Sequence, residues 1–380
     1  MIIGVFIKDI KTYENIHFIP IGLDSNFCGL NGVNGIGKSS ILEAFDSFFN
    51  RKNWNTNLKL PKDQQAYLMP VFLIERPSIT KDLQESFTII NDFLLSENLL
   101  ASKDEHKNPI NQFKSHLRLI KERCDLSNKY LIACGKDSNH NSTFGLFSLL
   151  FPNKYLGFNT SQIDAVYDFL KESFEYIYIP KDIDSDIFTK LETQEIQSMM
   201  GSSLAQELNH IIDDKTLRNI NEKLNELLTR ISKSLVNYSY RTHRGKQTNL
   251  KRNDLYKVIL QAFFSIRKLY KKYGADEWLE ISSLSSGEKQ KAIIDVAKNL
   301  IKDHKENKEK IILAIDEPES SLHISACYEQ FESIYEISKY CRQLIFTTHW
   351  YGYFPIIESG STVSITKIKS DHQFDLVSLG

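Results

Sequence analysis

The chain has 380 residues, of which 41% are hydrophobic, and its 47 Lys and Arg residues nearly balance 48 Asp and Glu residues. This length and apolar content predict a globular protein, either one large domain with an insertion or two domains. The formal net charge of −1 excludes a chain that is basic throughout, so any site for a polyanion must be local.

The sequence shows no sign of export or of a membrane segment. Its five cysteines form no CxxC pair and are odd in number, which is typical of reduced thiols in a cytoplasm. The N-terminus has charges every few residues and lacks a signal-peptide cleavage site. No apolar run reaches the roughly 20 residues that a membrane helix needs. We therefore expect a cytoplasmic protein without membrane contact.

Residues 1–30 predict three strands. Ile3, Val5 and Ile7 alternate as in a strand, residues 11–13 form a turn, and a second strand runs through residues 17–19. A third apolar stretch, FCGL, leads directly into NGVNGIGKSS. This last segment carries the strongest motif of the chain.

Residues 32–39, GVNGIGKS, match GxxxxGK[ST] between a strand and an amphipathic helix, SSILEAFDSFF. The glycines let backbone N–H groups surround a phosphate, and the helix N-terminus adds partial positive charge. We expect Lys38 to reach the β and γ phosphates of ATP and Ser39 to bind Mg²⁺. The flanking elements disfavour the alternative, a glycine turn that binds nothing. The candidate nucleotide-binding residues of this loop are Asn34, Gly35, Ile36, Gly37, Lys38, Ser39 and Ser40.

The middle of the chain carries weaker signals. Residues 67–76 predict a strand, 81–135 are largely helical, 174–180 return to strand character, and 202–235 show helical spacing. The apolar positions of the last segment sustain no heptad repeat over many turns, so a long coiled coil is not expected.

These signals predict three parts along the chain. Residues 1–78 form an N-terminal lobe and residues 256–380 a C-terminal lobe of one nucleotide-binding head. Residues 79–255 form a mainly helical insertion that contributes one core strand near 174–180.

One basic segment stands out in the middle region, YRTHRGKQTNLKR at residues 240–252. It contains no acid, and it could contact nucleic acid phosphate or an acidic partner. The alternative is a solvated loop before the next helix. Its cations are Arg241, Arg244, Lys246, Lys251 and Arg252.

An apolar run in residues 309–323, EKIILAIDEPESSLH, ends in two acids. An unbroken apolar run predicts a strand buried on both faces of a parallel sheet, with Asp316 and Glu317 at its carboxyl end, where α/β folds bind ligands. We expect Asp316 to hold Mg²⁺, usually through water, and Glu317 to polarise the attacking water.

A second apolar strand, residues 344–346, ends at TTHW. This position would place His349 near the same phosphate as a sensor or hydrogen-bond partner. A histidine without such neighbours is more often structural.

The segment SSLSSGEKQ places Ser285, Ser286 and Gly287 at the start of a helix. Serine and glycine at a helix N-terminus offer N–H groups and hydroxyls, and so a second phosphate-binding site. This site is best explained if it binds the γ phosphate held by another protomer, so that ATP joins a homodimer. The apolar face of the helix is expected to be Ala292, Ile293, Val296 and Leu300.

LSSGEKQ resembles the signature motif of ABC-type ATPases, and with the P-loop, ILAIDEPE and TTHW it completes their motif order. IKDIKTYENIHF and DEPESSLH resemble the branch that contains SMC, RecF and OLD proteins. The resemblance implies an α/β fold, an ABC-ATPase head with a mixed sheet and a P-loop core, carrying a large, mainly helical insertion. It also implies hydrolysis of ATP with Mg²⁺.

The resemblance assigns a role to each matching residue. It implies Lys38, Glu317 and His349 as catalytic residues and Ser39 and Asp316 as metal ligands. It implies contacts with the nucleotide from the basic turn at Lys11 and, in trans, from Ser285, Ser286 and Gly287. The Q-loop glutamine of these ATPases has three candidates, Gln64, Gln65 and Gln84.

Within this branch, OLD-type nucleases carry a TOPRIM domain after the ATPase, whereas the residues after His349 leave room for two short strands. The chain looks most similar to the stand-alone ATPase subunits of the bacterial antiphage systems Septu and PARIS. This implies a separately encoded effector, of nuclease type, as a partner. One alternative is a RecF-like DNA-repair ATPase, which residues 240–252 support. Another is a transporter subunit, which the insertion disfavours.

Overall fold

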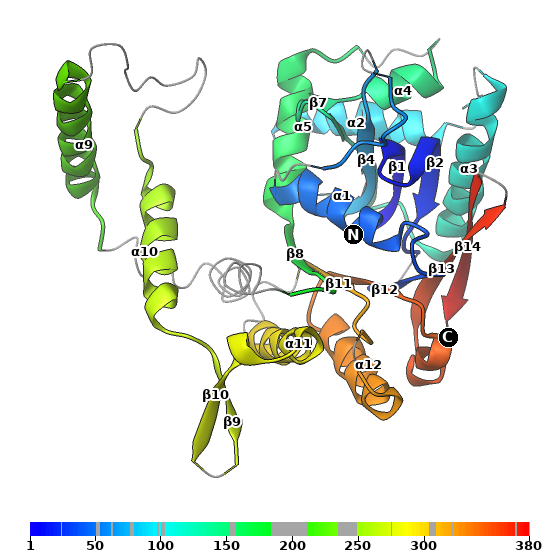
Figure 1. Ribbon diagram of the computed structural model, residues 1–380. Coiled ribbons are helices and arrows are strands. Elements are labelled where there is room, and N and C mark those ends of the chain that lie inside the picture. The colour runs from blue at the N-terminus through cyan, green and yellow to red at the C-terminus, as the bar shows by residue number, and fades with distance from the viewer. Residues whose placement is uncertain are drawn as a thin grey trace. The chain divides into compact units, whose positions relative to one another are not determined.

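The computed structural model describes the chain except residues 24, 51–53, 62–63, 77–79, 97–98, 100–102, 153–156, 184–210, 235–248, 275, 304–308, 321, 369–370 and 380. The chain divides into two compact units (Figure 1). We call residues 1–183 with 285–380 the head, and residues 184–284 the inserted unit. The predicted insertion, residues 79–255, has different bounds, because residues 81–183 contribute strands and helices that pack within the head.

One sheet of the head is antiparallel throughout. Its strands are β1 (Ile2–Ile10), β2 (Tyr13–Pro20), β4 (Tyr67–Glu75), β5 (Lys129–Ala133), β6 (Gly135–Asp137) and β7 (Ser142–Thr143). They run in the order β2-β1-β4-β6-β7, and β5 also pairs with β4. The hairpin of β1 and β2 is the one that the alternating apolar residues and the turn at residues 11–13 predict.

The second sheet of the head contains the parallel strands. It has the order β14-β13-β3-β12-β11-β8, and every neighbouring pair is parallel except β13 with β14. All six residues of β11 and all six of β12 are buried, as predicted for apolar strands covered on both faces. The strands are β3 (Phe27–Asn31), β8 (Glu175–Ile179), β11 (Ile311–Asp316), β12 (Gln343–Thr348), β13 (Gly360–Ile368) and β14 (Asp371–Leu379).

Helix α1 (Lys38–Asn50) lies between the two sheets (Figure 1). It contacts β4 of the antiparallel sheet and β8, β11 and β12 of the parallel sheet. Because both sides of the helix are covered, its buried apolar residues surround the helix axis and do not form a single stripe. They are Ile41, Leu42, Ala44, Phe45, Phe48 and Phe49.

The other helices of the head cover the outer faces of the sheets. Four of them, α2 (Lys81–Leu95), α3 (Lys107–Arg123), α4 (Gly145–Leu150) and α5 (Thr160–Ser173), contact strands of the antiparallel sheet. Helices α11 (Ser286–Asp303) and α12 (Ile324–Ser338) pack against each other, and α12 contacts β12. Two short 3₁₀ helices span Asp104–His106 and Tyr351–Ile356.

Residues 129–137 form strands, although the sequence predicts a largely helical segment over residues 81–135. The four consecutive residues 130–133 are all buried, which a helix with one exposed face does not allow. In β5 they pair with β4, where Ile132 lies opposite Phe72 and Leu131 opposite Leu73. Cross-strand pairing therefore decides the structure of this segment.

The buried stripe of α11 differs by one residue from the predicted face. Ile293, Ala297 and Ile301 are buried, whereas Ala292, Val296 and Leu300 are half-buried. Successive residues differ by about 100° around a helix, so this shift rotates the buried face by the same angle. Both stripes are apolar at intervals of four, and packing within the head selects one of them.

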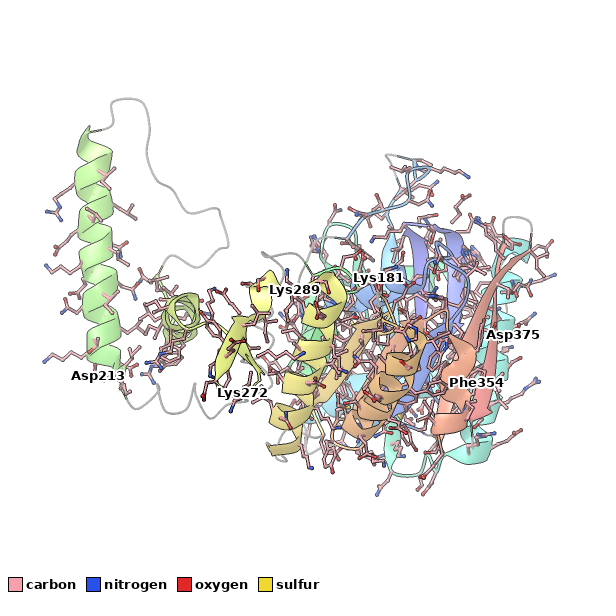
Figure 2. All side chains as sticks on the ribbon, turned by 60° about the horizontal axis from the view of Figure 1, so that its bottom comes forward. Lys181, Asp213, Lys272, Lys289, Phe354 and Asp375 are labelled. Atoms are coloured by element: carbon pink, nitrogen blue, oxygen red, sulfur yellow. The ribbon has the colours of Figure 1, made fainter. Side chains whose placement is uncertain are left out.

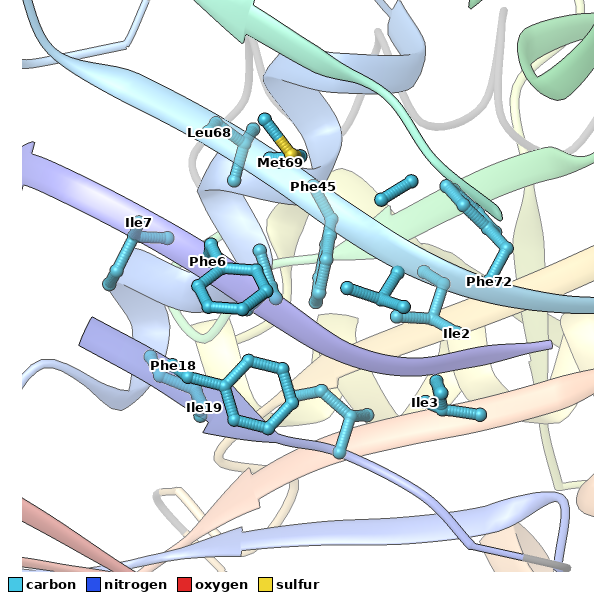
Figure 3. Close-up of a cluster of buried hydrophobic side chains, with 14 of the residues drawn as sticks. Ile2, Ile3, Phe6, Ile7, Phe18, Ile19, Phe45, Leu68, Met69 and Phe72 are labelled. Atoms are coloured by element: carbon cyan, nitrogen blue, oxygen red, sulfur yellow. The ribbon is translucent and has the colours of Figure 1, made fainter. Parts of the chain in front are cut away.

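Aromatic and aliphatic side chains of β1, β2, β4 and α1 form the core drawn in Figure 3. The rings of Phe6 and Phe18 lie 4.8 Å apart, and those of Phe6 and Phe113 lie 5.3 Å apart. Such aromatic pairs contribute about 0.5–1.5 kcal/mol each beyond the burial of their area. A Cβ atom on Gly4 would lie 2.5 Å from Cζ of Phe18, so only glycine fits at this position.

The inserted unit contains two helices and a hairpin in its described part, α9 (Asp214–Ser234), α10 (Arg252–Ile266), β9 (Tyr270–Tyr273) and β10 (Glu277–Glu280). A 3₁₀ turn, Ile281–Ser283, follows β10. Residues 240–248, with most of the predicted basic segment, lie outside the described residues. Of the helices that the structure describes, none combines the length and the apolar character needed to cross a membrane.

Candidate active site

Four neighbouring parallel strands, β3, β12, β11 and β8, end at the same edge of the head. The P-loop follows β3, His349 follows β12, Asp316 ends β11 with Glu317 directly after it, and Lys181 follows β8. The carboxyl edge of a parallel sheet is the usual ligand site of α/β folds. Strand pairing thus brings together residues that are distant in the sequence.

The P-loop is held open by its glycines and by contacts from the β1–β2 turn. Gly35 and Gly37 have positive φ values of 76° and 112°. A Cβ atom on Gly37 would lie 2.5 Å from Oγ1 of Thr12, so a larger residue does not fit. The Tyr13 hydroxyl donates a hydrogen bond of 3.2 Å to the Gly37 carbonyl. Asn34 and Gly35 are exposed at the tip of the loop, where a ligand can reach their N–H groups.

The ammonium group of Lys38 lies inside the loop. Its Nζ donates to the carbonyl oxygens of Gly32, at 2.8 Å, and Val33, at 3.2 Å. The same Nζ lies 3.5 Å from Oε1 of Glu317. Lys38 therefore links the P-loop to the acid pair after β11.

Oxygen ligands suited to Mg²⁺ lie beside this lysine. Ser39 Oγ donates a 2.8 Å hydrogen bond to Oδ1 of Asp316, and the same oxygen accepts from the hydroxyl of Thr347. Burial raises the pKa of Asp316, although the two hydroxyl donors act in the opposite direction. No group of three or more His, Cys, Asp or Glu residues in the described part could hold a metal ion. A hydroxyl and one carboxylate fit Mg²⁺, which also takes water and substrate phosphates.

Glu317 is held by its backbone and by cations around its carboxylate. Its φ of 41° is unusual for a residue other than glycine, and its N–H donates to both O and Oγ1 of Thr347. Lys181 Nζ donates to Oε2 at 2.7 Å. Burial alone would raise the pKa of Glu317, but the hydrogen bond and charge of Lys181, with Lys38 and His349, hold this pKa below its usual value.

His349 is bound to a third acid of the same loop. Its Nδ1 lies 3.1 Å from Oε1 of Glu319 and 3.9 Å from Oε2 of Glu317. The same Glu319 oxygen accepts hydrogen bonds from the backbone N–H of His349, at 2.9 Å, and from Oγ1 of Thr348, at 2.6 Å. Glu319 thus fixes the position of His349 at the edge of the site.

The three signature residues lie at the start of α11. Ser285 is exposed, and its hydroxyl donates to Oε2 of Glu288, which also accepts from the N–H of Ser285. The hydroxyl of Ser286 accepts from the N–H of Ile183 at 2.9 Å. Gly287 is buried. The described contacts of these residues do not include the P-loop of the same chain.

Lys11 lies in the turn between β1 and β2, and its Nζ is paired with Glu43 of α1. Ser40 is buried in the first turn of α1, and Ile36 is buried in the loop.

The three Q-loop candidates are distant from Asp316 and Glu317 in the sequence, and their described hydrogen bonds go to other residues. Gln65 bonds to Tyr67 and Lys8, Gln84 lies on α2, and the N–H of Gln64 donates to the carbonyl oxygen of Pro61.

Three residues of this site were not predicted from the sequence, Lys181, Glu319 and Gln290. The Gln290 amide donates to the carbonyl oxygens of Pro180, at 3.1 Å, and Asp316, at 2.8 Å. A signal existed for Lys181, because it directly follows the predicted strand 174–180 at its carboxyl end. Glu319 lies in the motif DEPESSLH and Gln290 in the motif LSSGEKQ.

The sequence matches the family model described as "AAA ATPase domain" over residues 1–350. The chain belongs to this family. It is an ATP hydrolase, and the match together with the sheet topology confirms the predicted α/β ATPase head. No curated protein matches the sequence.

Solved structures similar to this ATPase include head domains of SMC proteins. The SMC head bound to the C-winged helix domain of ScpA is 13% identical, with a TM-score of 0.48 over 100% of this chain and 98% of that chain. The SMC head from Thermotoga maritima is 14% identical, with a TM-score of 0.39 over 99% and 98%. A third, bound to the C-terminal domain of ScpA derived from Pyrococcus furiosus, is 13% identical, with a TM-score of 0.45 over 100% and 96%.

Replacing Glu319 by alanine is expected to destabilise the head by about 2 kcal/mol, because the buried Thr348 hydroxyl and the partly buried His349 N–H lose this acceptor. Glu319→Gln keeps an acceptor oxygen and should cost less. Urea unfolding measures both changes. Glu332→Ala on the exposed side of α12 is the matched control and should stay within about 0.5 kcal/mol of wild type. Equal stability of Glu319→Ala and the control would contradict this role.

Proposed function

We propose that the cluster at the carboxyl edge of the parallel sheet binds and hydrolyses ATP. The observation that supports this most directly is the contact network that joins the P-loop to the acid pair. In it, Ser39 bonds to Asp316, and Lys38 lies 3.5 Å from Glu317. The P-loop amides and Lys38 bind the phosphates. Ser39 and Asp316 hold Mg²⁺, which neutralises phosphate charge when it is bound.

Glu317 acts as the general base in this proposal. Its side chain is 6% exposed, and its low pKa keeps the carboxylate ionised, so that it can accept a proton from the attacking water. His349 is held by Glu319 and can donate a hydrogen bond toward the γ phosphate. Lys11, at the β1–β2 turn, contributes positive charge near the nucleotide.

We further propose that two protomers hold ATP between them. Ser285 is exposed at the N-terminus of α11, where its hydroxyl and the helix N–H groups can bind a phosphate presented by a partner. With Ser286 and Gly287, it forms the signature that acts in trans on the partner's nucleotide. ATP then stabilises the homodimer through its γ phosphate.

In the cell, we propose that this ATPase belongs to a bacterial antiphage system and controls a separately encoded effector of nuclease type. The motif order and DEPESSLH support this role through their resemblance to the SMC, RecF and OLD branch. The alternative is a RecF-like repair ATPase that binds DNA.

Glu317→Gln should bind ATP with wild-type affinity but lower kcat by about 100-fold or more, because the phosphate contacts remain while the water loses its base. Phosphate release and equilibrium ATP binding, measured on the same preparation, separate these two effects. Glu332→Ala provides the control for loss of a carboxylate outside the site. Turnover at the wild-type rate would remove Glu317 from the mechanism.

Ser285→Arg, made in the Glu317→Gln background, should abolish ATP-dependent dimerisation, because the large cation blocks the phosphate site on the partner-facing helix end. Analytical ultracentrifugation with and without ATP measures the association. Ser283→Arg introduces the same residue two positions earlier and should leave dimerisation intact. Dimers that form equally in both variants would contradict the role of the signature in trans.

Native mass spectrometry of Glu317→Gln tests the cellular role. The protein is purified with ATP and Mg²⁺ from cells that also carry its neighbouring genes. An even-numbered assembly that holds ATP and a second protein supports the regulator and identifies its effector. ATP-bound dimers that carry only nucleic acid, with DNA affinity falling steeply with salt, would replace it with the DNA-repair function.

A further inference from the structure

Lys181, labelled in Figure 2, follows β8 and is absent from every motif of the sequence, yet it contacts the proposed general base. Its Nζ donates to Oε2 of Glu317 at 2.7 Å, across 136 positions of the sequence. The Glu317 side chain is 6% exposed and the Lys181 side chain 37% exposed. The carboxylate of the pair is therefore mostly buried, while its cation is partly exposed to solvent. Such a pair loses less strength to solvent than one on the open surface.

The two carboxylate oxygens of Glu317 have different neighbours. Oε2 accepts from Lys181, while Oε1 lies toward Lys38 of the P-loop, at 3.5 Å. The bond from Lys181 therefore holds the carboxylate in an orientation that leaves its other oxygen toward the loop. A carboxylate that is fixed in this way is preorganised to receive a proton on one oxygen.

The segment that carries Lys181 is bound to helix α11 by its backbone. Ser286 Oγ contacts both the carbonyl oxygen of Lys181, at 3.4 Å, and the N–H of Ile183, at 2.9 Å. Gln290 is buried, and its amide donates to the carbonyl oxygens of Pro180 and Asp316. Two side chains of α11 thus hold the backbone of residues 180–183 next to the end of β11.

This segment also lies where the chain enters the inserted unit. The head continues to Ile183, and after the inserted unit the chain resumes at Ser285, one residue before Ser286. The hydrogen bond between Ile183 and Ser286 therefore joins the two points at which the head and the inserted unit are connected. Lys181 lies two residues before this junction.

We propose that Lys181 is a positioning residue that fixes the carboxylate of Glu317 and ties its orientation to helix α11. The inference rests on the proposed role of Glu317 as general base. It gives the inserted unit a route to the hydrolysis rate, through Ser286 and Gln290 to Lys181 and from there to Glu317. Lys181 acts on the reaction through Glu317 and is not assigned a contact with ATP.

Kinetics of Lys181→Ala, Lys181→Arg and the neighbouring control Asp182→Ala test the proposal. Lys181→Ala should lower kcat at least about tenfold, since a small misplacement of a catalytic group is costly, while KM and the equilibrium affinity for ATP stay within about twofold. Lys181→Arg keeps a donor cation and should recover most of kcat, and the exposed Asp182→Ala should resemble wild type. An unchanged or higher kcat in Lys181→Ala, or a loss confined to KM, would overturn the proposal.

Double variants test the two links separately. Adding Lys181→Ala to Glu317→Gln should cause no further loss of kcat, because Lys181 acts through Glu317. Gln290→Leu should lower kcat, and combining it with Lys181→Ala should again be non-additive. Additive losses of kcat in either pair would overturn the corresponding link. Urea unfolding of each variant tests whether the head is folded.

The outcome for Glu317→Gln distinguishes the two proposals. If that variant retains wild-type kcat, the general-base role and the inference about Lys181 both fail. If it loses activity while Lys181→Ala does not, only the inference about Lys181 fails.

Discussion

The parallel pairing of β3, β12, β11 and β8 is the constraint on which the site depends. It aligns four strand ends at one edge, so Lys38, His349, Glu317 and Lys181 meet although they come from distant parts of the chain. Helix α1 starts at this edge and is buried between the two sheets, which fixes the P-loop relative to the acids. A site built on strand ends is more rigid than one built on loops alone.

Several elements of this arrangement could be predicted from the sequence, because local patterns determine them. The glycines of the P-loop, the apolar run before Asp316 and the strand before His349 each predict a strand followed by a functional turn. Residues 129–133 were missed, because their pairing with β4 is decided by a strand more than fifty positions away. Lys181 was missed for the same reason, since its partner Glu317 is 136 positions away.

Glu317 combines a positive φ with a mostly buried carboxylate that has cations on more than one side. The hydrogen bonds from the Glu317 N–H to Thr347 fix the backbone of this residue, and the bond from Lys181 fixes its carboxylate. Because the anchors of Lys181 lie on α11, the orientation of the proposed base is tied to the same helix that begins with the signature residues. Under the roles proposed for the signature and for Glu317, nucleotide binding and the geometry of hydrolysis are linked within one protomer.

The proposed site depends most on the binding of ATP phosphates by Lys38. Isothermal titration of ATP into Lys38→Ala tests it directly, with the exposed Lys81→Ala as the matched control. We expect Lys38→Ala to lose at least about 100-fold in affinity, because a buried ammonium group leaves the phosphate site, while Lys81→Ala binds like wild type. Wild-type affinity in Lys38→Ala would show that ATP binds elsewhere and would contradict the account of the site.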